Sequence, residues 1–222
     1  MKELSYNGYN FFIEVKIKPK NKYVYCRYKN GLITITSFRK LTDSEIKKII
    51  VDNFDNLLEI INKPMPTTIH YLGKEYQIRV INSNDENIII ENNIIYINTL
   101  DSSDDNKRRL IYNLYANTLK EILIENHKYY EMLFDINFNV NYNIKTVKTY
   151  FGECYSKRGI INLNTKLAKY PKDMILSVLA HELAHFKYPN HSNDFYNYLE
   201  SKTPGYMKLR KRFKNLKYND KY

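Results

Sequence analysis

Residues 172–195 read KDMILSVLAHELAHFKYPNHSNDF and contain the pattern His-Glu-x-x-His. In a helix, His181 and His185 lie one turn apart on the same face, because residues four positions apart are neighbours on a helix surface. Apolar side chains fill most other positions of the run and can be buried. The stretch therefore predicts a helix over Lys172–Lys187 that is packed on one face and lines a cleft with the other.

Two histidines at this spacing can bind one Zn²⁺, with Glu182 beside the metal as the base for the bound water. A catalytic zinc needs a third protein ligand and an open fourth position. His191 follows His181 by ten residues, and Pro189 disfavours helical geometry at the residue before it, so the chain turns back there. We expect a zinc site made by His181, His185 and His191, in which Glu182 takes a proton from the activated water.

Other interpretations of these residues stay open. A buried histidine usually has a purely structural role, although three of the five histidines lie within eleven residues of one another. Asp194 and Glu200 are weaker candidates for the third ligand. His70 and His127 lack such neighbours and are interpreted as surface or packing residues.

The two cysteines, Cys26 and Cys154, cannot form a disulfide framework and lack the spacing of a metal site. Cys154 is interpreted as a small buried hydrophobe, with a zinc ligand or a nucleophile as the alternatives. Tyr198 or Tyr206 could donate a hydrogen bond to the transition state. With 22 tyrosines in the chain, the sequence does not identify the donor.

The 222 residues include 35 Lys and Arg and 24 Asp and Glu, so the formal net charge is +11. This charge permits a nucleic acid or nucleotide partner at a basic surface without demonstrating one. The tail Tyr206–Tyr222 is rich in Lys and Arg and is either a solvated face or a binder of phosphate groups. No run approaches 18 apolar residues and the first residues lack an apolar signal region, so we expect no membrane segment and a cytoplasmic location. The oligomeric state is left open.

The N-terminal part predicts short strands and one helix. Alternating runs over residues 8–38 predict antiparallel strands, with a turn at Asn30-Gly31. Thr42 and Glu45 have the spacing of a capping box at the start of a helix, and Lys63-Pro64-Met65-Pro66 would end it.

The rest of the chain predicts a second strand-rich segment followed mostly by helices. His70–Ile81 and Asn87–Asn98 are interpreted as a hairpin pair with its turn at Asn82–Glu86. The further elements expected are a long helix over Asp104–Asp135, strands over Asn137–Tyr150 and Gly159–Leu163, and a short helix over Asn193–Ser201. Strands first and helices last predict an α+β fold.

Several segments of the chain resemble those of a known family. Leu179–Phe195, LAHELAHFKYPNHSNDF, resembles the YgjP-like metallopeptidases, in which HELaH is followed by a short basic turn, NHS and a Phe. Tyr150–Asn164, YFGECYSKRGIINLN, is similar to that family's WGSCSSKGNINLN strand. Tyr71–Ile81 (YLGKEYQIRVI) resembles a hairpin of the family, and Pro204–Phe213 (PGYMKLRKRF) resembles its C-terminal PdYkerrkwL. The resemblance covers most of the chain, and the zinc motif is its most specific part.

The resemblance implies zinc ligands at His181, His185 and His191 and a catalytic Glu182. It also implies one YgjP-like domain over residues 1–222. The expected parts are a strand-rich N-terminal part (1–100), a zincin-like catalytic part (101–204) and a basic C-terminal tail (205–222). The expected fold is α+β, with N-terminal antiparallel strands and a helix packed on a zincin-like half that carries the HExxH helix.

The predicted function is that of a zinc-dependent peptidase acting on peptides or proteins. Two positions depart from the family, with Phe151 for its Trp and Glu153 for its Ser, which leaves the choice of substrate open. The family is related to SprT-like and WLM-type zincins, some of which cut proteins crosslinked to DNA, so a nucleic-acid-associated protease is a variant.

Two further functions stay open. Some relatives are labelled nucleoside triphosphate pyrophosphohydrolases, so a zinc-dependent nucleotide hydrolase is the main alternative. A binding module with a vestigial metal site is the third, although the intact Glu182 argues against it, because a structural site needs no base.

Overall fold

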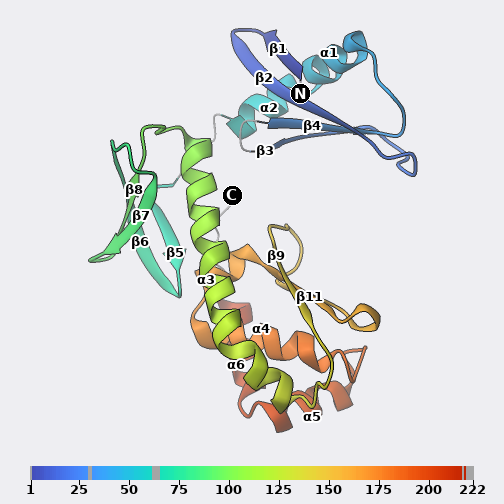
Figure 1. Ribbon diagram of the computed structural model, residues 1–222, viewed down its shortest axis with the longest axis vertical. Helices are drawn as coiled ribbons and strands as arrows, with labels where there is room; N and C mark the ends of the chain where they lie inside the picture. Colours follow the sequence, from blue (N-terminus) through green and yellow to red (C-terminus); the bar gives the residue numbers. More distant parts are fainter. Residues whose placement is uncertain (1, 30–31, 62–65, 217, 219–222) are drawn as a thin grey trace. The chain divides into compact units, whose positions relative to one another are not determined.

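The computed structural model describes residues 2–29, 32–61, 66–216 and 218. Contacts divide the chain into an N-terminal unit (Met1–Met65 with Asp101–Arg109) and a C-terminal unit (Pro66–Leu100 with Leu110–Tyr222). Helices and sheets occur together in the structure (Figure 1), which confirms the predicted α+β class. The organisation as one domain over residues 1–222 stays a prediction.

The N-terminal unit holds a four-stranded sheet in the order β1-β2-β4-β3. Its strands are β1 (Lys2–Tyr6), β2 (Tyr9–Ile17), β3 (Tyr25–Lys29) and β4 (Leu32–Ser37). The β1–β2 and β3–β4 pairs are antiparallel, as expected, whereas the central strands β2 and β4 are parallel. Strand β1 was not foreseen from the sequence, and the expected turn at Asn30-Gly31 lies outside the described residues.

Two helices follow this sheet. Helix α1 (Asp43–Asp52) begins with the expected capping box between Thr42 and Glu45. The single long helix expected here is wrong, because α1 ends at Asp52, with Asn53 as its C-cap, and a separate helix, α2 (Phe54–Ile61), follows. The Ile49 carbonyl accepts both the side-chain amide (2.8 Å) and the backbone N–H (3.2 Å) of Asn53 at the end of α1. The expected helix end at Lys63-Pro64-Met65 lies outside the described residues.

The core of the N-terminal unit is formed by apolar side chains from the sheet and both helices. Its buried members are Phe11, Ile13, Ile33, Ile35, Leu41, Ile46, Ile50 and Leu57. The alternating burial along β4 directs Ile33 and Ile35 into this core.

The C-terminal unit begins with a second four-stranded sheet, in the order β5-β6-β8-β7. Its strands are β5 (Thr68–Tyr71), β6 (Lys74–Ile81), β7 (Asn87–Glu91) and β8 (Ile94–Asn98). The turns Leu72-Gly73 and Asn92-Asn93 have positive φ at both residues, as type I′ hairpin turns require. Each segment expected to be one strand is therefore a hairpin, and Asn82–Glu86 joins the two hairpins.

The HExxH segment lies among the elements that follow the second sheet. They are α3 (Asp104–Leu133), β9 (Asn141–Lys145), β10 (Gly152–Tyr155), β11 (Ile160–Asn164), the short 3₁₀ helix η2 (Thr165–Lys169), α4 (Lys172–Ala184), α5 (Asn193–Lys202) and α6 (Tyr206–Asn215). The third sheet has the order β10-β11-β9, with β10 antiparallel and β9 parallel to β11. Helix α4 packs against β10, β11, α5 and α6 (Figure 1).

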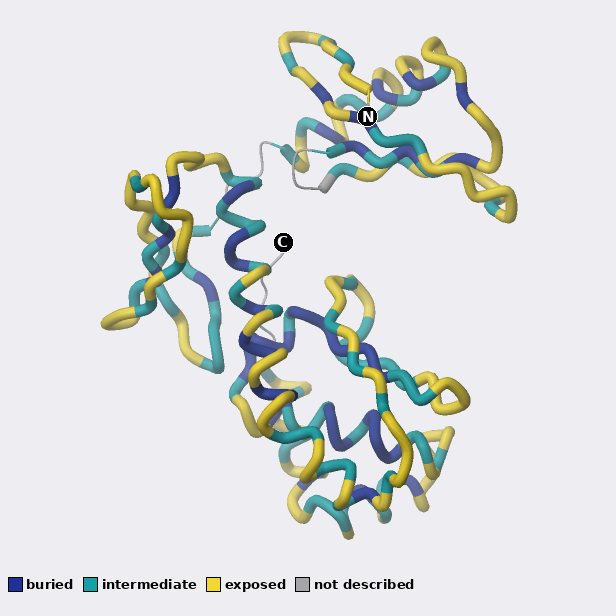
Figure 2. Tube along the Cα trace, viewed as in Figure 1, coloured by how far each residue is buried: buried dark blue, intermediate teal, exposed yellow. Residues whose placement is uncertain are grey.

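The sequence-based boundaries fit the helices α3, α4 and α5 to within a few residues. The strand expected over Asn137–Tyr150 is shorter than predicted, and the basic tail contains the unforeseen helix α6. Buried positions recur along α4 (Figure 2), as expected for a helix covered by its neighbours. In the part of the chain that the structure describes, no helix combines the length and the apolar character needed to cross a bilayer.

Candidate metal centre

Helix α4 positions the first two histidines. His181 lies in its last turn and His185 at its C-cap, so the side chains are one helical turn apart. Their rings approach to 4.9 Å between centroids. The helix is anchored by fully buried apolar residues, with Leu179 and Leu183 on the side away from the histidines and Met174 two turns before His181. Packing therefore fixes the helix that carries the motif.

The chain turns back after α4 and brings the third histidine to the first. The His185 Nδ1–H donates to the Tyr188 carbonyl (3.0 Å), because a carbonyl oxygen can only accept. Ser192 then caps α5 by accepting from the Phe195 N–H. His191 immediately precedes this cap, and its Nε2 lies 2.8 Å from His181 Nε2. The turn expected near Pro189 is thus present.

The three imidazoles have the proximity that one metal ion requires. Ligand nitrogens of His181, His185 and His191 all lie within 4.8 Å of one another. Nitrogens about 2.0–2.1 Å from one tetrahedral zinc would be roughly 3.3 Å apart, which this cluster approaches. Burial and the neighbouring histidines lower the pKa of His181 to about 3, and burial also lowers the pKa of His185. Both rings are therefore neutral at pH 7, which is the state that binds metals.

Glu182 is buried beside this cluster. It is 5 % exposed, and burial, followed by the negative charge of Glu153, raises its pKa to about 8. A cation at the histidines would favour the ionised carboxylate and lower this pKa. The carboxylate is thus placed to gain or lose a proton next to a metal.

Strand β10 touches the Glu182 carboxylate through Gly152. A Cβ at this position would lie 2.4 Å from Glu182 Oε1, closer than side-chain atoms can approach. Only glycine leaves room for the carboxylate against this strand. No role was assigned to Gly152 from the sequence. Its position within a segment of strand character could have indicated the close approach of another group, because glycine inside a strand often marks such an approach.

Tyr206 of α6 contacts the Nδ1 side of the His181 ring, away from the other two histidines. Its hydroxyl is 2.8 Å from His181 Nδ1, and the residue is buried. Since Nδ1 is engaged, Nε2 is the atom that faces the other histidines. The other candidate donor, Tyr198, gives its hydroxyl to the Phe134 carbonyl (3.2 Å). In this arrangement both hydroxyls are engaged by other groups of the protein.

The weaker candidate ligands lie elsewhere. The Glu200 carboxylate accepts from the backbone N–H of Gly205 (2.7 Å) and Met207 (3.0 Å), which fixes the start of α6. Asp194 is exposed in the first turn of α5. Burial raises the pKa of the half-buried Cys154 thiol to about 12, so it is protonated and a poor nucleophile at pH 7.

The two remaining histidines are outside the cluster. His70 stacks on Tyr218 with 4.0 Å between ring centroids. His127 lies 3.3 Å from Glu131 through Nδ1. Both positions agree with the interpretation of these residues as packing or surface histidines.

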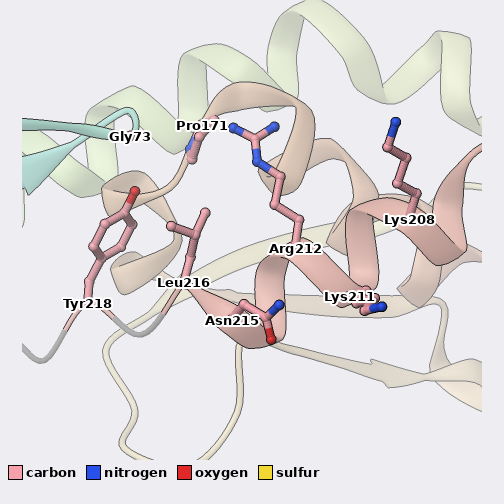
Figure 3. A pocket seen from close by; sticks show the side chains of 8 residues that line it. All are labelled: Gly73, Pro171, Lys208, Lys211, Arg212, Asn215, Leu216 and Tyr218. Atoms are coloured by element: carbon pink, nitrogen blue, oxygen red, sulfur yellow. The ribbon is translucent and has the colours of Figure 1, made fainter.

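Basic residues of α6 line a surface cavity of about 580 Å³ (Figure 3). Lys208, Lys211 and Arg212 supply its positive charge, while Pro171 and Leu216 contribute apolar surface. Its lining includes neither Glu182 nor any of the three clustered histidines, so this cavity is distinct from the histidine cluster.

Comparison with known proteins gives one family match and several similar structures. A family model described as YgjP-like, metallopeptidase domain, matches residues 22–216. The metallopeptidase zymogen abylysin of Pyrococcus abyssi is 22% identical, with 44% of this chain and 92% of that chain covered and a TM-score of 0.38. The zymogen jannalysin of Methanocaldococcus jannaschii is also 22% identical, with 44% and 94% covered and a TM-score of 0.37. No curated protein matches the chain.

Proposed function

The chain belongs to the YgjP-like metallopeptidase family, and we propose that it is a zinc-dependent peptidase. In this proposal His181, His185 and His191 bind the metal, and Glu182 is the general base. The substrate is a peptide or an unfolded protein segment.

One observation carries the proposal: three imidazoles converge beside a buried carboxylate that no other described residue hydrogen-bonds. A purely structural metal site needs no base, and structural zinc sites are usually closed by four protein ligands. Here the third histidine is exposed, which leaves the cluster accessible to a substrate.

The chemistry is divided between metal and carboxylate. A bound zinc ion supplies Lewis acidity, which polarises the scissile carbonyl and acidifies water. Glu182 takes the proton from the attacking water and returns it to the departing amine. Its buried position beside Gly152 holds the carboxylate in place for both transfers. His185 and His181 are oriented by the Tyr188 carbonyl and the Tyr206 hydroxyl.

Strand β10 supplies a place for the substrate backbone. It is an edge strand that pairs only with β11 in its sheet as described, and it starts at Gly152. An extended peptide can add to such an edge through main-chain hydrogen bonds. A peptide bound there would pass next to Glu182.

The first test is the zinc content of protein purified without added metal. We expect about one zinc per chain in the wild type and a sharply weaker site in His191→Ala. His127→Ala is the matched control, because it removes an imidazole outside the cluster and should keep the zinc. A wild-type protein without zinc, even after reconstitution, would overturn the assignment.

The second test separates the base from the ligands. Glu182→Gln should keep the zinc but lose nearly all cleavage of a labelled unfolded protein such as casein. Unchanged turnover in this variant would contradict the role of Glu182. Metal-dependent phosphate release from nucleoside triphosphates, without protein cleavage, would instead support a nucleotide hydrolase.

A further inference from the structure

The inner face of α6 is fixed at two points next to the proposed active site. Tyr206 contacts the ring of His181 through its hydroxyl. Phe213, seven residues later and on the same side of the helix, packs edge-to-face on Phe151 with 4.8 Å between ring centroids. Phe151 directly precedes Gly152, whose backbone meets the Glu182 carboxylate. The helix therefore runs from the histidine side of the site to the β10 side.

Arg210 lies between these two fixed points, one turn after Tyr206. Its guanidinium carbon is 4.6 Å from the centre of the Tyr196 ring, and that ring stacks on His191 with 6.1 Å between centroids. Arg210 is thus a cation next to the histidine cluster, held by an aromatic ring.

Arg210 has no acidic partner among the residues that the structure describes. The other basic side chains of α5 and α6 that are fixed by contacts have one: Lys202 pairs with Asp135 (2.8 Å) and Arg212 with Asp173 (3.3 Å). Arg210 is partly exposed, and no described residue accepts a hydrogen bond from its guanidinium. A guanidinium matches a carboxylate because two parallel N–H groups meet its two oxygens.

We propose that Arg210 binds a carboxylate of the peptide substrate, so that the enzyme prefers peptides with an acidic group near the cleaved bond. This inference rests on the proposed peptidase function and deepens it by naming a substrate class. The carboxylate comes either from an aspartate or glutamate side chain or from the C-terminus of a short peptide. Both offer the same pair of oxygens to the guanidinium.

Peptide binding to zinc-loaded Glu182→Gln protein tests the proposal without turnover. Four fluorescent nonapeptides of one sequence are compared, with Glu or Gln at the centre and with a free or an amidated C-terminus. We expect the Glu peptides, or the free-acid peptides, to bind about 10- to 100-fold more tightly than their neutral counterparts. The pair that shows the difference identifies the source of the carboxylate.

Substitutions in the same background then assign the preference to Arg210. Arg210→Gln should bring the ratio close to one, and Arg210→Lys should keep part of it, because the charge stays and the fork is lost. Lys211→Gln removes one positive charge from the adjacent, exposed position of α6 and should leave the ratio unchanged. Unchanged thermal unfolding of each variant shows that it is folded.

Three outcomes would overturn the proposal: equal affinity for all four peptides, a preference that survives Arg210→Gln, or stronger binding of a nucleoside triphosphate than of any peptide. Failure of the peptidase function is recognised separately. In that case the carboxylate preference depends on Arg210, but wild-type protein does not cleave the best-bound peptide.

Discussion

The sheet β1–β4 and the sheet β5–β8 have the same topology and different surroundings. Each consists of two antiparallel hairpins joined through a parallel central pair, β2 with β4 and β6 with β8. Ile35 of β4 and Ile97 of β8 occupy the same register position, and both are 0% exposed. The first sheet packs with α1 and α2 in its own core, whereas the second contacts the segment leading into α4.

The first turn of each sheet shows the difference. Gly8 and Gly73 have almost the same φ, +80° and +83°. A Cβ on Gly8 would meet nothing within 4 Å, but a Cβ on Gly73 would lie 2.5 Å from Pro171 Cγ. The backbone N–H groups of Leu72 and Gly73 also donate to the Ala168 and Lys169 carbonyls (2.8 and 2.9 Å). The same local turn is therefore free in one sheet and supports the start of the HExxH helix in the other.

The largest expected effect comes from two equivalent substitutions that each leave a cavity in the core next to one of the sheets. Ile35→Ala and Ile97→Ala should each lower the free energy of unfolding by about 2–5 kcal/mol, because each removes a buried side chain. Only Ile97→Ala should also weaken zinc binding, since its sheet is bonded to the residues before α4. Denaturant unfolding and zinc titration measure the two effects. An equal loss of zinc affinity in Ile35→Ala would contradict the expectation that only the second sheet supports the zinc site.

Removing the metal should change the rate of amide hydrogen exchange near the second sheet but not in the first sheet. Zinc at a thousand-fold excess over its dissociation constant stabilises the protein that binds it by about 4 kcal/mol. We expect chelation to speed exchange at Leu72, Gly73 and α4, and to leave the β1–β2 hairpin unchanged. Mass spectrometry of exchanged peptides measures both regions at once. Faster exchange in β1–β2 alone would contradict the expectation.

Alanine substitutions at Gly8 and Gly73 compare the stability that each turn requires. Gly8→Ala should cost about 1–2 kcal/mol, the penalty for a positive φ in a residue with a Cβ. Gly73→Ala should cost about 3 kcal/mol, because the new Cβ also displaces Pro171. Thermal unfolding of the two variants against the wild type gives the difference. Equal costs would mean that the contact with Pro171 does not restrain the turn.

The smallest effect is a pH dependence confined to the N-terminal unit. The hydrogen bond from Arg39 and that from the Thr42 N–H lower the pKa of the exposed Glu45 to about 2. An ionised Glu45 therefore stabilises the folded state above its unfolded pKa of about 4.3, and this contribution is lost as the pH falls towards 2. Glu45→Gln should be less stable than the wild type at pH 7, with a difference that shrinks below pH 4. A difference that is constant with pH would exclude this ionisation.

Local signals in the sequence predicted much of the molecule. Thr42 and Glu45 marked a helix start through a capping box, and the pattern over Lys172–Lys187 marked α4. The spacing of His181, His185 and His191 was enough to predict that they converge, because helix geometry and a proline determine it. The α+β class followed from the order of strands and helices.

Contacts between distant segments were decided by the tertiary structure. The amino acids around Gly152, Tyr206 and Arg210 carry no periodic signal that links them to residues 181–191. They approach the histidines only because β10 and α6 pack against α4. The parallel pairing of β2 with β4 and of β6 with β8 also joins strands from different hairpins. A turn motif predicts only the pairing of the two strands that it connects, so no turn in the sequence indicates these parallel pairs.

The sequence by itself determined that the three histidines cluster, that Glu182 lies beside them and which elements carry them, because these features depend on residues a few positions apart. Only the tertiary structure decided which residues surround that centre. Glu182 meets Gly152 across about thirty positions of sequence, and His181 meets Tyr206 across twenty-five. Such contacts form only when separate elements bury their apolar faces together, and a single sequence does not state which faces will meet.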